Sequence, residues 1–288
     1  MGEHALARVA ADGDGDVAFL RHRELQTDET DGSGTVVRLR VPRTWIERFQ
    51  VVEYTRAFLA GRAAFSAARM LLIISGAFGV FRREAVLAVG GYRTDTVGED
   101  MELVVRLHRR MRDERRPYKI RYLIDPVCWT QVPRDRATLR RQRDRWHRGL
   151  LETLWRHRGM LLRPRYGRLG FVAMPFFWIF EAAGPLLEVA GYLLVLALLA
   201  TGLLDPLFAI AFLALALVYG ILVSVAAFGV EVFLRTRYAT LRDRWALLAA
   251  ALAENLGYRQ WLALVRLRAS FRVTRSAGTW GEMRRERL

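Results

Sequence analysis

Residues 169–234 read LGFVAMPFFWIFEAAGPLLEVAGYLLVLALLATGLLDPLFAIAFLALALVYGILVSVAAFGVEVFL, and this stretch decides how the chain is organised. It contains no lysine or arginine, and its charged residues are Glu181, Glu188, Asp205 and Glu231. All 45 lysine and arginine residues of the 288-residue chain therefore lie outside this stretch. The net charge of the whole chain is +16. A run of this length can cross a hydrocarbon layer of about 30 Å twice. The pattern predicts membrane association and argues against a soluble nucleic-acid-binding protein.

The apolar stretch divides at Asp205-Pro206 into two segments that are each long enough to span a bilayer. Residues 184–204 form the first segment and residues 207–232 the second, which we expect to tilt. Arginines precede the first segment and follow the second, so the positive-inside rule predicts that both ends are cytoplasmic. The N-terminus lacks the pattern of a signal peptide. We therefore expect 169–234 to form two transmembrane helices of a multi-pass inner (plasma) membrane protein, with membrane lipid as a partner.

The region after the apolar stretch is amphipathic. Residues 245–267 combine many leucines and tryptophans with Glu254, Asn255, Arg259 and Arg266. Because charges at the centre of a membrane are costly, we favour an interfacial helix over a third span. Residues 268–288 are then a basic cytoplasmic tail.

The polar body before the apolar stretch alternates predicted strands with predicted helices, which indicates an α/β fold. Glycine and aspartate fill 12–16 and 31–34, so we expect residues 1–35 to be poorly ordered. The elements expected in 36–165 are strands at 36–41, 71–74 and 118–124 and helices at 45–70, 83–89, 99–111 and 136–158.

Asp100 is the first candidate for chemistry. On a helix that begins near Glu99, Asp100 shares a face with Leu103, Val104 and Leu107, so its carboxylate points toward the interior. A buried carboxylate needs a reason, and catalysis is one. The alternative is a helix-capping acid, because negative charge in a first turn complements the helix dipole.

The second candidate is Gln142-Arg-Asp-Arg-Trp146. On a helix Gln142, Arg145 and Trp146 share one face, which combines an amide, a guanidinium and an indole. Arginine can bind a diphosphate through its planar fork, an amide can bond a hydroxyl, and an indole offers an apolar plate to a sugar. The alternative is an interfacial tryptophan beside snorkelling arginines.

Together these motifs resemble the membrane-embedded processive glycosyltransferases of family 2, the group of cellulose, hyaluronan, chitin and poly-N-acetylglucosamine synthases. The motifs that carry the resemblance, from about residue 36 to the C-terminus, are Glu53-Tyr54 with Arg56 and Arg62, Ser75-Gly-Ala-Phe-Gly79, Phe81-Arg-Arg83, Gly90-Gly-Tyr92, Thr96-Val-Gly-Glu-Asp100, Trp129-Thr130, Gln142-Arg-Asp-Arg-Trp146, Glu254-Asn255 and Tyr258-Arg259. The resemblance implies the second, acceptor-side half of a GT-A-type domain in 36–165, followed by a transmembrane hairpin.

The resemblance also implies roles for particular residues. Asp100, supported by Glu99, would be the general base that deprotonates the acceptor hydroxyl as it attacks a UDP-sugar with inversion. Arg143 and Arg145 would stabilise the leaving diphosphate, Gln142 would help hold the site, and Trp146 would stack under the acceptor sugar. The acceptor loop would be Ser75, Gly76, Ala77, Phe78 and Gly79. Glu181 and Glu188 lie seven apart on one face and would line the mouth of a product channel.

The family also binds a divalent metal, Mg or Mn, through a D-x-D pair in the donor-nucleotide half that normally precedes this region. Asp14-Gly-Asp16 has these letters but lies in a glycine-rich stretch without a preceding buried strand, so we assign it no metal role. We expect the metal ligands to be absent from this chain. An upstream-encoded donor half is then an expected partner, beside the UDP-sugar and the glycan acceptor.

Two other functions remain open from the sequence. One is a catalytically inactive membrane remnant or partner subunit that binds glycan or another chain. The other is a peripheral protein whose arginines hold anionic lipid.

Overall fold

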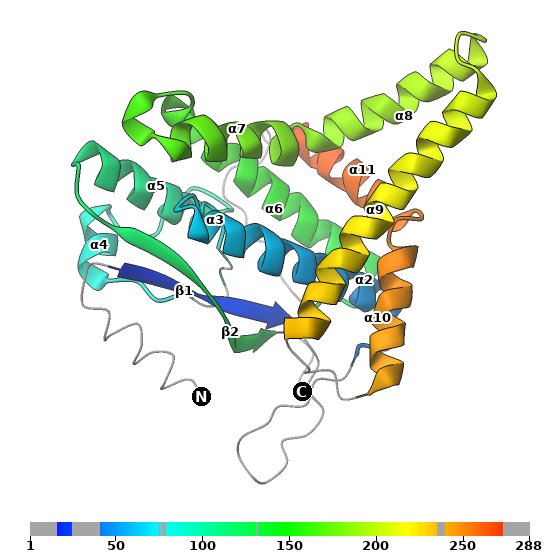
Figure 1. Cartoon of the computed structure of the whole chain (residues 1–288). Coiled ribbons are helices and arrows are strands. Elements are labelled where there is room, and N and C mark those ends of the chain that lie inside the picture. The colour runs from blue at the N-terminus through cyan, green and yellow to red at the C-terminus, as the bar shows by residue number, and fades with distance from the viewer. Residues whose placement is uncertain are drawn as a thin grey trace.

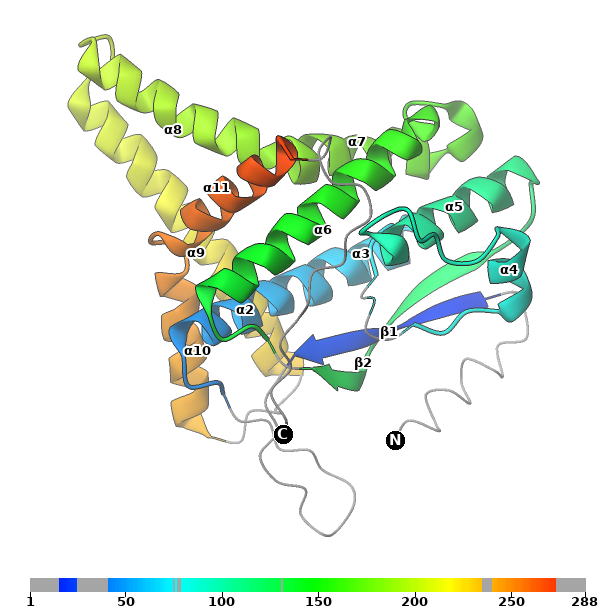
Figure 2. The ribbon, with the colours of Figure 1, turned by 180° about the vertical axis from the view of Figure 1, so that it is seen from behind.

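Helices dominate the structure, and two parallel strands lie along one side of them (Figure 1). This computed structural model describes residues 16–24, 41–74, 76, 79–130, 132–234 and 240–272. Figures 1 and 2 show the strand pair on one side of the helical segment from α2 to α3, with α6 on the other side. The described part of the chain is therefore more helical than the expected α/β pattern.

The strands β1 (Asp16–Glu24) and β2 (Lys119–Thr130) pair in parallel, and the register shifts on both sides of Arg21. Strand β2 contains most of the predicted strand 118–124 and is longer. Strand β1 lies within 1–35, where we expected poor order; the apolar run at 17–20 is a short strand-forming sequence that the surrounding glycines and acids obscured. Most of the predicted strand 36–41 lies outside the described residues.

The strand predicted at 71–74 is not formed. Leu71, Leu72 and Ile74 are buried, as a core strand would be, but their backbone belongs to no sheet among the described residues. A short apolar run indicates burial without specifying a hydrogen-bonding partner, which is why the pattern was misleading here.

A nearly continuous helical segment replaces the predicted helix 45–70. It comprises α2 (Trp45–Thr55), the π-helix η1 (Arg56–Arg62) and α3 (Ala63–Ala67). Thr44 and Glu47 form a capping box, in which the threonine side chain accepts from Glu47 N and the glutamate accepts from Thr44 N. The π-helix widens the turn at η1, a feature often found at functional sites.

Three predicted helices of the polar body are confirmed with small shifts at their ends. They are α4 (Arg83–Ala88), α5 (Glu99–Asp113) and α6 (Arg136–Arg156). The face of α5 that was predicted to be apolar is buried, with Leu103 and Val104 completely so, and Leu139 and Leu154 of α6 are completely buried as well. The short turns η2 (Arg158–Met160) and η3 (Pro164–Tyr166) then lead to the apolar stretch.

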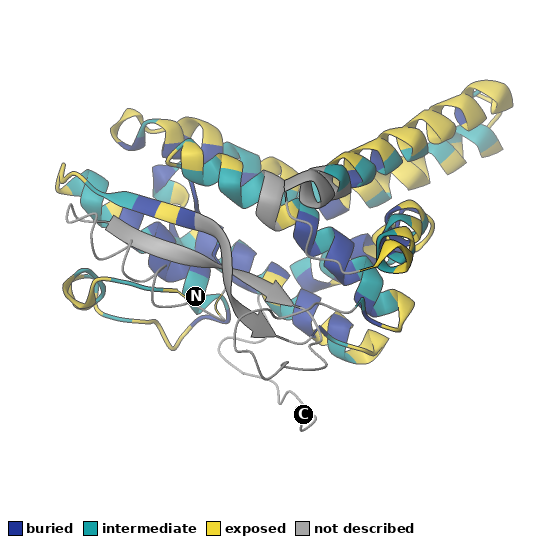
Figure 3. Cartoon of the chain, turned by 60° about the horizontal axis from the view of Figure 1, so that its bottom comes forward, coloured by how far each residue is buried: buried dark blue, intermediate teal, exposed yellow. Residues whose placement is uncertain are grey.

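The apolar stretch forms a bent helical path followed by a long helix. The elements are η4 (Leu169–Ala173), α7 (Met174–Phe176), η5 (Phe177–Ala182), α8 (Gly184–Ala200) and α9 (Pro206–Leu234). Helices α8 and α9 project from the body and meet at their far ends, and their outer surfaces are largely exposed (Figures 1 and 3). Among the described residues, Pro206–Ala226 is long and apolar enough to cross a membrane, and Leu169–Ala182 with Gly184–Ala200 passes the same test as a pair bent by 46°.

The single helix predicted at 245–267 is instead two helices, α10 (Leu241–Ala253) and α11 (Tyr258–Ser270). Gly257, the N-cap of α11, has a φ of 94°, a backbone conformation that few other residues adopt without strain. Helix α10 packs against α2 and α9, and α11 packs against α6 and α8 (Figure 2). Both helices therefore bury a face against the body, and the expectation of a single helix is not met, whereas its placement at a membrane surface stays a prediction.

A buried polar cluster joins these helices where α10 ends. Glu254 is fully buried and forms an ion pair with Arg56 of η1. Ser224 of α9 donates to Glu254 Oε1 at 2.6 Å and accepts from Arg56 at 2.8 Å. Gly220 of α9 makes room for the neighbouring Asn255, because a Cβ there would lie 2.6 Å from Asn255 Oδ1. The first turn of the π-helix is thus tied to α9 and to the corner between α10 and α11.

Candidate active site

The first turn of α5 carries the two carboxylates of the candidate site. Asp100 is half-buried, and its Oδ1 accepts a hydrogen bond of 2.7 Å from the backbone N–H of Met101. Gly76, from the predicted acceptor loop, lies directly against it: a Cβ at Gly76 would be 3.1 Å from Asp100 Oδ2. The predicted base and one residue of the predicted acceptor loop are therefore neighbours.

The electrostatic setting favours proton uptake by these carboxylates. Burial raises the pKa of Asp100, and the backbone N–H groups of Met101 and Gly76 together with the charge of Arg62 only partly oppose this. Burial and the negative charge of Asp100 also raise the pKa of Glu99, which Arg145 of α6 partly offsets. A carboxylate with a raised pKa is a better proton acceptor when it is ionised, which suits a general base.

The residues of the motif on α6 differ in their exposure and in their neighbours. Arg145 is half-buried and close enough to Glu99 to lower its pKa. Trp146 is 41 % exposed, so its ring is available to a ligand. Gln142 is buried, and its Oε1 has no hydrogen-bond partner among the described residues. A buried amide oxygen without a partner is suited to accept a hydrogen bond from a ligand hydroxyl.

Arg143, which we expected to face the diphosphate, has a different environment. Its guanidinium forms an ion pair with Glu53 of α2, with Nη1–Oε1 at 2.9 Å, and it is 7 % exposed. Arg143 lies about 100° around the helix axis from Gln142, and its guanidinium carbon is 4.6 Å from the centroid of the Trp146 ring. Glu53 therefore holds Arg143 beside Trp146, and the role expected for Arg143 at the diphosphate stays a prediction.

Two glycines bring α5 and α6 together. A Cβ on Gly98, which precedes α5, would lie 2.8 Å from Gly149 Cα, and a Cβ on Gly149 would lie 2.7 Å from Gly98 Cα. Backbones can approach this closely only where neither residue carries a side chain. This contact sets the distance between the carboxylates on α5 and the motif on α6.

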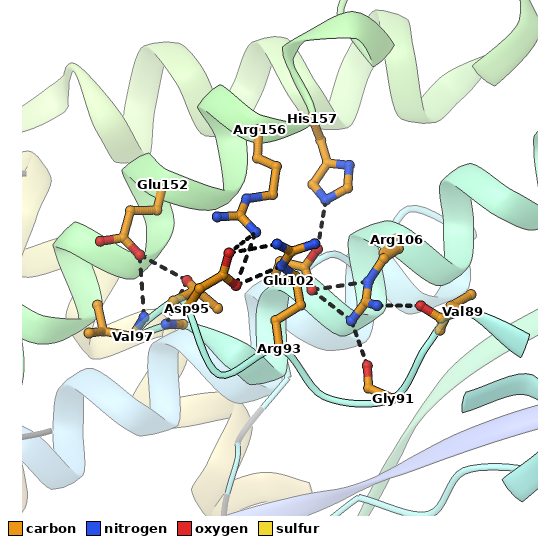
Figure 4. Close-up of polar contacts among 12 residues, drawn as sticks. Val89, Gly91, Arg93, Asp95, Val97, Glu102, Arg106, Glu152, Arg156 and His157 are labelled. Atoms are coloured by element: carbon orange, nitrogen blue, oxygen red, sulfur yellow. Dashed lines mark hydrogen bonds and ion pairs between the residues drawn. The ribbon is translucent and has the colours of Figure 1, made fainter. Parts of the chain in front are cut away.

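The loop that leads into α5 is held by side chains of α5 and α6 (Figure 4). Glu152 accepts hydrogen bonds from Thr96 Oγ1 at 2.8 Å and from Val97 N at 3.3 Å. Arg106 donates to the backbone oxygens of Val89 and Gly91. The loop carries Tyr92, whose pKa is raised by burial and by the charges of Asp100 and Glu99, so its ring lies near the carboxylate pair.

Glu102 orients Arg106, which holds the loop that leads into α5. It is fully buried, pairs with Arg106 at 2.9 Å, and has its Oε1 3.1 Å from His157 Nε2. Burial alone would raise the pKa of Glu102, but His157 and Arg106 hold it below its ordinary 4.5. The stability that Glu102 contributes is therefore present above about pH 4.5 and is lost as the pH falls through the lowered value.

We expect Glu102→Gln to lower the free energy of unfolding by about 1–3 kcal/mol at neutral pH, because it weakens two charged hydrogen bonds in a buried site. The difference from the wild type should shrink as the pH falls below about 4.5. Thermal unfolding between pH 3 and pH 8 measures both effects. Glu114→Gln, at the exposed end of α5, is the matched control, and equal losses in the two variants would contradict the assigned role of Glu102.

The other predicted site residues are partly placed. Gly79 is described and exposed, whereas Ser75, Ala77 and Phe78 lie outside the described residues. Glu181 forms an ion pair with Arg266 of α11 at 3.0 Å. Glu188 is exposed and accepts a hydrogen bond from Tyr192. The two acids expected to line a channel therefore differ, because one is already paired with a cation.

Three residues near the site were not assigned a role from the sequence. Arg62 acts on Asp100 through its charge, Tyr92 lies near the carboxylates, and Glu53 binds Arg143. All three stand in the motifs that carried the family resemblance. The signal was present, but a motif does not state which side chain meets which.

The carboxylate pair with raised pKa values and the exposed Trp146 fit the glycosyltransferase class that the sequence motifs indicated. Comparison with known families gives the same class. The chain belongs to the family "Glycosyl transferase family group 2", whose model matches residues 19–224. This match suggests a GT-A-type fold.

The curated relatives include poly-beta-1,6-N-acetyl-D-glucosamine synthases. Those of Staphylococcus aureus (strain COL) and Staphylococcus epidermidis are each 32% identical to this chain over 119 residues, which is 41% of the chain. The match covers 27% of each relative, so the chain spans about a quarter of their length. The chain is thus a family 2 glycosyltransferase that is similar to a polysaccharide synthase.

Family 2 enzymes generally use a divalent metal. Within the described residues, no group of three or more histidine, cysteine, aspartate or glutamate side chains could hold one. Asp14 and the side chain of Asp16 lie outside the described part. The roles proposed for this chain are assigned to its described side chains alone.

Proposed function

We propose that this chain transfers a sugar from a UDP-sugar to a growing β-linked polysaccharide with inversion, and that Asp100 is the general base. The observation that carries the proposal is the position of Asp100. It stands in the first turn of α5, half-buried, against the backbone of Gly76, with its pKa raised by burial. Asp100 also accepts a hydrogen bond from the backbone N–H of Met101, as a capping acid does, but capping does not require its packing against Gly76.

In the proposed reaction the acceptor hydroxyl oxygen attacks the anomeric carbon and forms the new glycosidic bond. The bond between that carbon and the diphosphate oxygen breaks, and UDP leaves with the electron pair. Asp100 takes the hydroxyl proton. Arg145 balances the negative charge that develops on the diphosphate, which its half-buried position across from Glu99 supports.

Trp146 and Gln142 bind the acceptor in this proposal. The exposed indole of Trp146 provides an apolar plate for the C–H face of the terminal sugar. The Oε1 of Gln142 accepts a hydrogen bond from a sugar hydroxyl, which would satisfy an atom that has no partner among the described residues. The combination discriminates a sugar from a purely apolar ligand.

Helices α8 and α9 form a membrane hairpin in this proposal, with both of its ends in the cytoplasm at the inner membrane. Their exposed apolar surfaces favour lipid over water. Glu188 remains a candidate for the product channel because it is exposed on α8. Glu181 has a structural partner in Arg266 and is a weaker candidate.

Sugar incorporation tests the proposed function. Membranes that contain the full chain are supplied with radiolabelled UDP-N-acetylglucosamine or UDP-glucose, with Mg²⁺, Mn²⁺ or chelator. A parallel arm contains a separately expressed donor half with a D-x-D motif. Label in an acid-insoluble polymer in either arm is the expected result. Binding of acceptor oligosaccharide without incorporation in both arms would contradict the proposal and favour an inactive glycan-binding subunit.

A further inference from the structure

Glu53 on α2 is bound by residues from two distant helices. The two carboxylate oxygens of Glu53 receive the two terminal nitrogens of Arg143, at 2.9 Å and 3.0 Å. The hydroxyl of Tyr258, the first residue of α11, also donates to Glu53 Oε2 at 3.3 Å. A bidentate pair fixes the plane of the guanidinium, because both nitrogens of the fork are engaged.

The plane of the Arg143 guanidinium lies against the tryptophan of the candidate acceptor site. Its central carbon is 4.6 Å from the centroid of the Trp146 ring and 5.3 Å from that of Tyr54. Arg143 is 7 % exposed, so this cation–π contact is largely shielded from water, where such contacts are strongest. The plane that Glu53 fixes therefore supports the indole of Trp146 from one side.

Tyr258 is held firmly where α10 meets α11. Its ring packs against Phe49 of α2 with a centroid distance of 4.8 Å. The preceding residues contain Glu254, which forms a buried ion pair with Arg56 three residues after Glu53. The corner between α10 and α11 thus contacts two successive turns of the α2 and η1 segment.

We propose that Glu53 and Tyr258 are positioning residues for Trp146, so that the corner between α10 and α11 sets the orientation of the acceptor-binding indole. This inference rests on the proposed function of Trp146. The order of contacts is Tyr258 to Glu53, Glu53 to Arg143, and Arg143 to Trp146. None of the first three needs to touch the sugar. The C-terminal helices, which the sequence assigned to the membrane surface, then act on acceptor affinity.

Tyr258→Phe tests the inference because it removes one hydroxyl and keeps the ring on Phe49. Tyr192→Phe is the matched control, since it removes a hydroxyl that donates to Glu188 at 3.0 Å. The full chain is labelled with fluorotryptophan, and the ¹⁹F signal of Trp146 is assigned by its loss in Trp146→Phe. We expect Tyr258→Phe and Glu53→Gln to shift or broaden that signal and Tyr192→Phe to leave it unchanged. An unchanged signal in Tyr258→Phe and Glu53→Gln overturns the inference, whether or not the chain is active.

Transfer to a soluble acceptor oligosaccharide provides the second readout. Tyr258→Phe should raise the KM for the acceptor about three- to tenfold, which corresponds to one modest hydrogen bond, and leave kcat within about twofold. In a Trp146→Ala background Tyr258→Phe should have no further effect on this KM. If Tyr258→Phe raises the acceptor KM as much in the Trp146→Ala background as in the wild type, the inference is overturned. A different outcome is a ¹⁹F signal that shifts in Tyr258→Phe together with an acceptor KM that does not change in Trp146→Ala. This outcome would contradict the proposed acceptor role of Trp146, and it would support the positioning role of Tyr258 and Glu53.

Discussion

Asp100→Asn should abolish measurable polymer synthesis, with a rate lowered by about 10²–10⁴-fold, and should leave the fold intact. The amide keeps the shape of the carboxyl group and still accepts a hydrogen bond from Met101 N, but it cannot take a proton from the acceptor hydroxyl. Sugar incorporation in membranes measures the loss. Asp135→Asn is the matched control, because Asp135 is an exposed N-cap of α6 and asparagine caps a helix equally well.

Asp100→Asn should raise the stability of the fold at neutral pH although it lowers the rate of transfer. Burial raises the pKa of Asp100 above its ordinary 3.8, so the folded state favours the protonated form. Stability from this group is therefore present below pH 3.8 and is lost as the pH rises through the raised value. Asparagine resembles the protonated form, so Asp100→Asn should melt at a higher temperature than the wild type at pH 7.

Activity should follow the same ionisation in the wild type. Transfer requires ionised Asp100, so the rate should fall as the pH is lowered through the raised pKa, at a higher pH than an ordinary aspartate would give. A pH profile of incorporation measures this limb. An Asp100→Asn variant that synthesises polymer at the wild-type rate, or that melts at a lower temperature, would contradict the assignment of Asp100 as a buried base.

Gly149→Ala should reduce sugar transfer by about 100-fold, because it separates the two halves of the site. A Cβ on Gly149 would lie 2.7 Å from Gly98 Cα and 2.8 Å from Gly98 N, which is closer than such atoms can approach. Helix α6 must then move away from the start of α5, which carries Asp100. We also expect the free energy of unfolding to fall by about 1–3 kcal/mol from overpacking.

Gly159→Ala is the matched control for this prediction. It is the same chemical change ten residues later, and nothing lies within 4 Å of the added Cβ. Its activity and melting temperature should match those of the wild type. Incorporation assays and thermal unfolding of the two variants provide the comparison. If Gly149→Ala retains full activity, the close approach of α5 and α6 does not set the geometry of the site.

Helices of the polar body were predictable because their signals are local. The apolar spacing of α5 repeats with the helical period, so both this helix and its buried face follow from neighbouring residues, and the extent of α6 was also predicted from local sequence. The two apolar segments that became α8 and α9 were predictable for the same reason. The site residues Asp100, Arg145 and Trp146 could be singled out from spacing and resemblance, and the structure places Arg145 near the carboxylate pair.

Elements that depend on distant partners were not predictable. Strand β1 exists through its pairing with β2, which lies about a hundred residues later, and the buried run 71–74 found no strand partner among the described residues. The helix predicted at 245–267 divides at Gly257, and the leucines on both sides concealed the break. A short apolar run reports burial, but a sheet or a helix corner is decided by what packs against it.

The sequence by itself determined the class of the protein, the apolar hairpin and the face on which Asp100 or Trp146 stands, because each is a property of consecutive residues. Only the tertiary structure decided that Arg143 pairs with Glu53, that Arg266 pairs with Glu181, and that Tyr258 donates a hydrogen bond to Glu53. A helical period states in which direction a side chain points. The charge or ring that this side chain contacts depends on the packing of helices that are far apart in the chain. The free energy of a charged contact then depends on the partner and on how deeply the pair is buried.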